Sequence, residues 1–209
     1  MSNNRRLPTL FIFFFLLLFS LNTAAKNTIV NSLIPELELS EEEYYIRMEN
    51  VVNLKTTGYK ELKSITVLDD DANRKTIFYR NYSDGPMLHT KQKLDFAIEG
   101  SGFFVLQTPM GNAYTRDGRF IIDREGNLLS RANLYPVLGE SGPIAVPNTE
   151  MTINQSGELY KDDERVGRFL IVGIINIKDL TSVNGVLFFA PLNKPLEFSI
   201  EEDYKIRQG

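Results

Sequence analysis

The sequence predicts a mainly β protein, with an irregular β-sandwich or barrel-like body and one short N-terminal amphipathic helix. Three observations support this fold class. From about Lys91 onward, apolar residues form short runs or alternate with polar ones, and Gly, Pro, Asn and Asp recur between the runs. A spacing typical of a helix is confined to one segment before residue 58. Short strands separated by turns favour antiparallel sheets over a parallel α/β fold.

The first 25 residues have the layout of a secretory signal peptide. Arg5 and Arg6 precede an apolar stretch over residues 7–21, and residues 22–25 are small or polar. As a helix, this stretch would extend about 22 Å, which is short of a hydrocarbon core of roughly 30 Å. We therefore expect residues 1–25 to be a signal peptide cleaved after Ala25. An uncleaved membrane anchor is the alternative.

A linker and a helical segment are expected next. Residues 26–40 contain a proline and no clear hydrophobic period, so they are predicted to be a linker. Residues 41–62 are predicted as a helical segment, because Ser40 can cap it and three glutamates suit the positive end of its dipole. A helix this short needs a partner surface, either the chain's own body or another subunit. The apolar stripe that would make this contact comprises Tyr44, Met48, Val51 and Val52.

The rest of the chain is divided by its turn residues. Gly58 is expected to end the helix in a left-handed conformation. Residues 63–90 are predicted as a connecting segment, in which residues 75–80 have strand character. Residues 91–209 are predicted to form the β-rich domain. Its expected strands include 103–106, 113–115, 119–122, 128–129, 135–138, 144–146, 151–153 and a central strand at 169–175, and Asn184-Gly185 predicts a tight hairpin before residues 186–189.

Composition argues against most enzyme classes. The chain has no Cys and a single His, His89, which excludes disulfides, thiolate zinc sites and cysteine nucleophiles and argues against histidine-based catalysis. The net charge is −4, and no run of Lys or Arg is long enough to follow a phosphate backbone. We therefore expect no metal, no cofactor and no nucleic-acid partner.

Two short patterns suggest chemistry, but each has a simpler structural explanation. Gly100-Ser101-Gly102 resembles part of a phosphate-binding loop, yet a strand follows it where such a loop would open a helix. Asp117, Asp123 and Glu125 could form an acid/base pair or a calcium cluster. They lie in Asp-Gly and Glu-Gly turns, where these residues are expected for backbone reasons. No catalytic constellation is therefore predicted.

Three segments carry longer motifs. Residues 50–60 are Asn-Val-Val-Asn-Leu-Lys-Thr-Thr-Gly-Tyr-Lys, residues 94–104 are Leu-Asp-Phe-Ala-Ile-Glu-Gly-Ser-Gly-Phe-Phe, and residues 114–120 are Tyr-Thr-Arg-Asp-Gly-Arg-Phe. Together they resemble the signatures of the bacterial flagellar hook and basal-body rod protein family. The last four residues also resemble the motif before that family's C-terminal helix. The motif positions are Asn50, Asn53, Thr56, Gly58, Tyr59, Leu94, Asp95, Ile98, Gly100, Gly102, Phe103, Phe104, Tyr114, Thr115, Arg116, Asp117, Gly118, Phe120 and Gly126.

The resemblance implies a non-enzymatic axial building block, with a β-rich domain outside an inner layer of paired terminal helices. Its partners would be other rod or hook subunits or copies of itself. It implies no small-molecule substrate, and contact with a membrane only through an uncleaved signal. The expected function is a structural component of the flagellar basal body that supports assembly and motility, located in the periplasm.

Departures from the family pattern shape this expectation. Glu49, Val52 and Lys55 stand where the family has Asn, Ala and Asn, and the family's C-terminal helix would begin where this sequence ends. Together with the signal peptide, these departures favour a divergent paralogue that caps, decorates or chaperones the axial structure. A minority rod subunit is an alternative. Two further alternatives are a periplasmic scaffold unrelated to motility and an envelope hydrolase that uses Asp117, Asp123 or Glu125.

Overall fold

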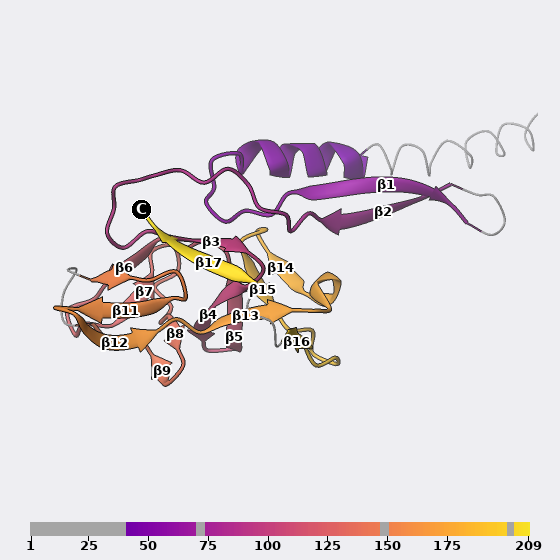
Figure 1. Ribbon diagram of the computed structural model, residues 1–209. Coiled ribbons are helices and arrows are strands. Elements are labelled where there is room, and N and C mark those ends of the chain that lie inside the picture. The colour runs from indigo at the N-terminus through magenta and orange to yellow at the C-terminus, as the bar shows by residue number, and fades with distance from the viewer. Residues whose placement is uncertain (1–40, 70–73, 147–150, 200–202) are drawn as a thin grey trace, which may run out of the picture. The chain divides into compact units, whose positions relative to one another are not determined.

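The computed structural model describes residues 41–69, 74–146, 151–199 and 203–209. The predicted signal peptide and linker lie outside these residues. The chain divides into two units, Met1–Met48 and Glu49–Gly209. The described residues are mainly β-strand, with a helix over residues 41–52, which confirms the predicted fold class (Figure 1). Within this part of the chain, no helix combines the length and apolar character needed to cross a bilayer.

The 41–52 helix ends before Gly58, in contrast to the expectation. The Asn53 side chain donates to the Glu49 carbonyl at 2.9 Å and accepts a hydrogen bond from the Thr56 hydroxyl at 3.0 Å. These local hydrogen bonds compete with the backbone hydrogen bonds that would continue the helix, as those of Asn side chains do at helix ends. Gly58 does adopt a positive φ of 73°, but in a separate turn in which Tyr59 N donates to Thr56 O at 3.3 Å.

The predicted connecting segment contains a two-stranded hairpin. β1 (Leu62–Leu68) and β2 (Arg74–Arg80) are antiparallel, with Leu62 opposite Arg80 and Ile65 opposite Ile77. Strand character was expected only at residues 75–80. β1 was missed because its side chains are mostly exposed. Its sequence therefore lacks the regular alternation of polar and apolar residues that marks a half-buried strand. A two-stranded sheet is marginally stable alone, so this hairpin depends on contacts with its surroundings.

A six-stranded sheet forms the centre of the β-rich region. Its order is β14-β15-β5-β4-β13-β16, and β13, from the run expected as a central strand, lies between β4 and β16. The Asn184-Gly185 hairpin is confirmed, since both residues have positive φ and Val186 N donates to Val183 O at 3.3 Å. The bounds are β4 (Phe103–Thr108), β5 (Gly111–Thr115), β13 (Ile171–Ile174), β14 (Thr181–Val183), β15 (Leu187–Phe189) and β16 (Phe198–Ser199).

Smaller sheets surround this one. β3 (Phe96–Gly100) pairs with β17 (Tyr204–Gln208), so the last strand lies beside the second motif (Figure 1). β11 and β12 were not predicted, because their two-residue turn is Asp162-Asp163 rather than a glycine pair. The remaining elements are β6 (Phe120–Ile122), β7 (Leu128–Ser130), β8 (Leu138–Gly139), β9 (Gly142–Pro143), β10 (Thr152–Ile153), β11 (Glu158–Lys161), β12 (Glu164–Arg168) and the 3₁₀ helix η1 (Ile177–Asp179).

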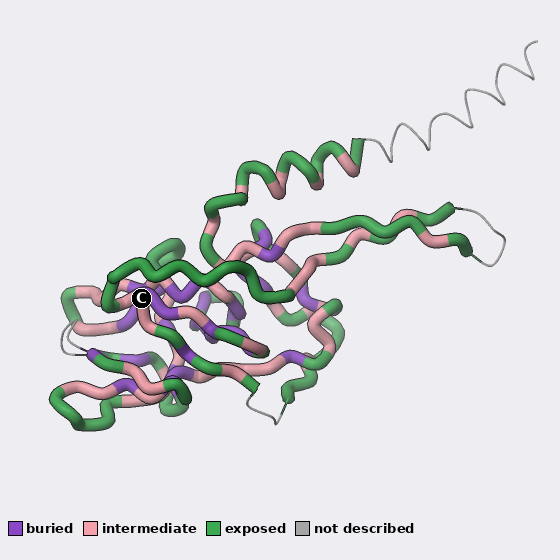
Figure 2. The backbone as a smooth tube through the Cα atoms, turned by 45° about the horizontal axis from the view of Figure 1, so that its top comes forward, coloured by how far each residue is buried: buried purple, intermediate pink, exposed green. Residues whose placement is uncertain are grey.

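Strand β4 is buried on both faces and joins the two parts of the core. Phe104 and Leu106 belong to a cluster with β3, β6 and β17, whereas Phe103 and Val105 point to the other side with β15. Four phenylalanine rings pack in this core with centroid distances of 5.1–6.0 Å, those of Phe96, Phe104, Phe120 and Phe169. Figure 2 shows that the buried residues gather in the β-rich region.

Candidate subunit-contact site

The end of the helix is fastened to strand β1 through Asn50. Its side-chain amide donates to the Leu62 carbonyl at 2.8 Å, and its carbonyl oxygen accepts from Leu62 N at 3.0 Å and from the Tyr59 hydroxyl at 2.7 Å. The Asn50 side chain, at the start of the first motif, therefore binds Tyr59 near the end of that motif and Leu62 just after it.

Glu49, next to Asn50, departs from the family pattern and is accommodated by an ion pair. Glu49, which replaces an expected Asn, forms an ion pair with Arg80 at 2.8 Å. The Arg80 guanidinium also lies 5.8 Å from the centre of the Tyr59 ring and donates to Lys60 O at 2.8 Å. Burial raises the pKa of the Tyr59 hydroxyl, which stays a neutral donor at physiological pH. Glu49 therefore holds the helix end against β2.

Gly58 brings the first motif into contact with the third, at residues 116 and 117. A Cβ at this position would lie 2.3 Å from Asp117 N and 2.6 Å from the Arg116 carbonyl carbon. Glycine is required here for two reasons, the positive φ and the close approach of the two backbones. These segments are far apart in the sequence, so the fold alone brings them together.

Arg116 is the centre of the contact on the β side. Its Nη2 donates to Gly100 O at 2.7 Å, and its Nη1 donates to Asp84 Oδ1 at 3.0 Å and Ile98 O at 3.3 Å. The guanidinium lies 5.2 Å from the centre of the Phe103 ring. Asp84 also accepts from Gly100 N at 2.8 Å, so Arg116 and Asp84 together hold the Gly-Ser-Gly corner. The corner thus contributes to a structural network rather than to a phosphate cradle.

Lys60 is buried next to this network. Its Nζ donates to Ser83 O at 2.8 Å and Tyr82 O at 3.1 Å, and only 6% of the residue is exposed. Burial lowers the pKa of Lys60 to about 8, the nearby Arg116 charge acts in the same direction, and Asp84 opposes both. We call the cluster of Gly58, Lys60, Asp84, Gly100 and Arg116 the junction. In the sequence, Lys60 is marked only as the last residue of the first motif, and no local pattern marks Asp84.

The apolar helix stripe lies outside the junction. Tyr44, Met48, Val51 and Val52 are 62%, 42%, 58% and 70% exposed. The helix is accordingly exposed along much of its length in Figure 2. The alternative in which this stripe packs against the chain's own body is not seen for Val51 and Val52, which belong to the same unit as the β-rich region.

The other motif residues contribute to the core and its turns. Buried apolar side chains fill the sheet, and Thr115 Oγ1 donates to Val186 O at 3.0 Å. Asp95 is buried and pairs with Arg131 at 3.3 Å. The positions in strands are Ile98, Gly100, Phe103, Phe104, Tyr114, Thr115 and Phe120, and those in turns or connections are Asn53, Thr56, Tyr59, Leu94, Asp95, Gly102, Arg116, Asp117, Gly118 and Gly126.

Two of the three carboxylates considered for catalysis, those of Asp117 and Asp123, are engaged in turns. Asp117 is buried and accepts two hydrogen bonds from the Arg119 guanidinium at 2.9 and 2.7 Å. Asp123 accepts from the backbone of Glu125 and from both nitrogens of Asn127, and these bonds lower its pKa. An acid held in its ionised form is a poor proton donor. Among the described residues, no group of three or more His, Asp or Glu side chains is placed to hold a metal.

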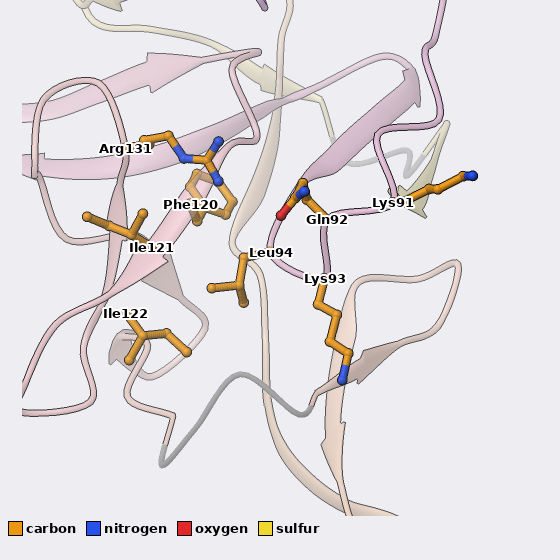
Figure 3. A pocket seen from close by; sticks show the side chains of 8 residues that line it. All are labelled: Lys91, Gln92, Lys93, Leu94, Phe120, Ile121, Ile122 and Arg131. Atoms are coloured by element: carbon orange, nitrogen blue, oxygen red, sulfur yellow. The ribbon is translucent and has the colours of Figure 1, made fainter.

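One open hollow of about 420 Å³ lies beside β6. Its floor is apolar, with Leu94, Ile121 and Ile122, while Lys91 and Lys93 point away from one another (Figure 3). Ligand pockets usually have a few polar groups that converge on one point. The hollow lacks that arrangement among its lining residues.

Comparison with known proteins identifies the β-rich region. Residues 97–161 match a family model described as the flagellar hook protein FlgE/F/G D1 domain. This region of the chain is similar to the D1 domain of flagellar hook and basal-body rod proteins. The resemblance of the motifs is thereby confirmed. The D1 match extends from β3 through β11. Gly100 and Arg116 of the junction lie within the matched region, whereas Gly58 and Lys60 precede it.

Several rod proteins are similar to this chain over part of their length. The flagellar basal-body rod protein FlgF of Caulobacter vibrioides is 33% identical over 149 residues, which cover 64% of this chain and 59% of that protein. FlgF of Escherichia coli K12 is 30% identical over 125 residues, covering 54% and 49%. FlgG of Buchnera aphidicola from Schizaphis graminum is 42% identical over 108 residues, covering 50% and 40%. The chain thus spans about half the length of these relatives.

Proposed function

We propose that the chain is a non-enzymatic structural component of the bacterial flagellar basal body that supports flagellum assembly and motility. It acts either as a rod-like or hook-like subunit or as a rod-associated paralogue. The observation that carries the proposal is the junction, which fastens a D1-type region to the end of a helix with an exposed apolar stripe. The relatives' names support it, since they are basal-body rod proteins and a hook protein.

The apolar helix stripe supports an assembly role. A helix of about three turns is marginal in water and gains most of its stability from packing. Exposed apolar side chains that are contiguous mark interaction surfaces more often than scattered ones. We therefore assign the stripe to contact with other rod or hook subunits or with copies of this chain.

The junction supports a mechanical role for the D1 region. Its bonds connect the helix end, the hairpin and the β-rich region through backbone atoms and buried charges. Such contacts leave little freedom at the connection, because each buried charge would lose its partner if the segments moved apart. A rigid connection suits a building block that transmits load between neighbours.

Engagement of the carboxylates in turns favours this role over an envelope hydrolase. A general acid needs a protonated carboxyl near neutral pH, whereas hydrogen bonds lower the pKa of Asp123. Asp117 is buried and forms an ion pair with Arg119. The Asp117 and Asp123 side chains therefore stabilise turns.

We also propose export to the periplasm by a signal peptide cleaved after Ala25. The basic start, apolar core and small residues before that position support it. N-terminal sequencing of the protein from fractionated cells should give Lys26 as the first residue. A first residue at Met1 would instead indicate an uncleaved segment.

The function is tested in a deletion strain of the source bacterium. We expect loss of swimming, restored by the wild-type chain but not by the double variant Met48→Glu/Val52→Glu. Ile175→Glu is the matched control, because Ile175 is 63% exposed but lies outside the helix. Tagged protein should co-purify with hook–basal bodies. A deletion strain that swims normally with complete flagella would favour the unrelated periplasmic scaffold.

A further inference from the structure

The β1–β2 hairpin has an exposed apolar face that the proposed function does not use. Side chains that alternate along paired strands lie on the same face, so Ile65 and its partner Ile77 share a face with Tyr79. These three residues are 50%, 43% and 42% exposed. We call this surface the outer hairpin face, which comprises Lys63, Ile65, Val67, Lys75, Ile77 and Tyr79.

The chain's own helix end is held on the opposite face. Arg80 and Leu62 are paired across the two strands and alternate with the outer residues. The Arg80 side chain binds Glu49 at 2.8 Å on the opposite face, and the backbone N–H and C=O of Leu62 bind Asn50 at the edge of β1. Because these contacts hold residues 49 and 50 to the opposite face and the edge, the helix end of the same chain does not cover the outer hairpin face.

The outer hairpin face and the apolar helix stripe match in length. From Tyr44 to Val52 the helix rises about 12 Å at 1.5 Å per residue. From Lys75 to Tyr79 the strand extends about 13 Å at 3.3 Å per residue. Each surface offers one row of apolar side chains over a similar length, and each is exposed.

Their charges are also complementary. Glu41 precedes Tyr44, Met48 and Val52 by three, seven and eleven positions, so it lies on the same side of the helix. On the hairpin, Lys75 is exposed at one end of the outer face, while Lys63 at the other end is paired with Glu61 at 2.9 Å. Among the described residues Lys75 has no ion pair. If the two surfaces meet with Glu41 next to Lys75, the opposite charges favour this partner and fix its orientation.

We propose that the outer hairpin face of one copy binds the apolar helix stripe of a second copy. The proposal rests on the proposed function and specifies which surfaces meet. The two surfaces differ, so the contact is heterologous, and its repetition extends an open row of copies rather than closing a dimer. A bound pair leaves one helix stripe and one hairpin face free, at opposite ends of the row, for further copies.

Cysteine cross-linking tests this contact, because the chain has no native Cys. Two differently tagged full-length chains, one with Val52→Cys and one with Ile77→Cys, are co-expressed in the deletion strain. Cells are treated with a short bismaleimide, and co-isolation of both chains with hook–basal bodies is measured in the same samples. We expect a cross-linked product carrying both tags. A chain with both substitutions should give a ladder of multimers.

Controls separate this contact from others. Val166→Cys on β12 replaces Ile77→Cys as an exposed position outside both surfaces and should give at least tenfold less product with Val52→Cys. Lys75→Glu in the hairpin copy should lower the yield severalfold, and Glu41→Lys in the helix copy should restore it. Restored swimming shows that each cysteine variant folds, and a circular-dichroism spectrum like that of the wild type shows this for the purified Lys75→Glu chain.

Two outcomes would overturn the proposal. Val52→Cys chains that cross-link to one another but not to Ile77→Cys chains would show that the helices pair with each other. Chains that co-isolate with basal bodies without any copy-to-copy product would show that another subunit covers the stripe. If the mixed product forms but no chain co-isolates with basal bodies, the contact stands and the proposed function fails.

Discussion

The backbone of Gly58 lies so close to that of Asp117 that a Cβ on the glycine would be 2.3 Å from the aspartate nitrogen. This approach joins the first motif to the third. It explains why a glycine is needed at a position that does not end the helix. Several expected outcomes follow from the junction and from the turns around it.

Gly58→Ala should destabilise the protein by about 2 kcal/mol or more. The alanine would be strained by its positive φ of 73° and would clash with backbone atoms that cannot move aside easily. Urea unfolding followed by circular dichroism measures the change. Gly85→Ala is the control, because nothing lies within 4 Å of that site, and it should change stability by less than about 0.5 kcal/mol. Equal effects of the two substitutions would contradict the close approach.

Stability should rise with pH between about pH 8 and 10 because of Lys60. Its pKa is about 8 in the folded protein and near 10.5 when unfolded, so the unfolded chain binds more protons in this range. Folding then becomes more favourable as pH rises, by at most about 1.4 kcal/mol per pH unit. Urea unfolding at several pH values should show this slope in the wild type.

Lys60→Met provides the comparison for that slope. The variant removes the titrating amine but keeps an apolar stem, so its stability should be nearly constant from pH 8 to 10. Measurements stop at pH 10, because burial raises the pKa values of Tyr59, Tyr82 and Tyr114 and their ionisation lowers stability at higher pH. A wild-type slope that persists in the variant would mean that another group titrates.

Arg116→Lys should destabilise the protein by about 2 kcal/mol, although it keeps the charge. A lysine cannot reproduce the planar set of bonds to Asp84, Ile98 and Gly100, so buried acceptors lose their donor. Thermal unfolding of the variant is compared with that of Arg124→Lys, whose side chain is exposed in a turn. Similar melting temperatures for both variants would show that Arg116 acts as a charge alone.

Asp163→Gly should stabilise the protein by about 0.5–1 kcal/mol. Asp163 has a φ of 66° in the two-residue turn between β11 and β12, and glycine adopts this conformation without steric strain. Arg124→Gly serves as the opposite control, because Arg124 is in a turn without a positive φ and should lose stability through added backbone freedom. Chemical denaturation distinguishes the two signs.

The fold class and many of the strands were predictable because local patterns encode them. Apolar runs bounded by turn residues predicted β4 to β7, and Asn184-Gly185 predicted the hairpin of β14 and β15. The β11–β12 hairpin was missed because two aspartates adopt the positive φ values that glycine usually marks. The end of the helix was misplaced because Asn53 terminates it through side-chain bonds.

By itself, the sequence determined the β-rich fold, the apolar helix stripe and the motifs that indicate the hook and rod family. Only the tertiary structure decided that Gly58 packs on Asp117, that Lys60 is buried near Arg116, and that the hairpin presents Ile65 and Ile77 on an exposed face. The physical reason is that hydrophobic periodicity records which side of a strand or helix is apolar. It does not record which distant backbone approaches it, because that depends on how the whole chain packs.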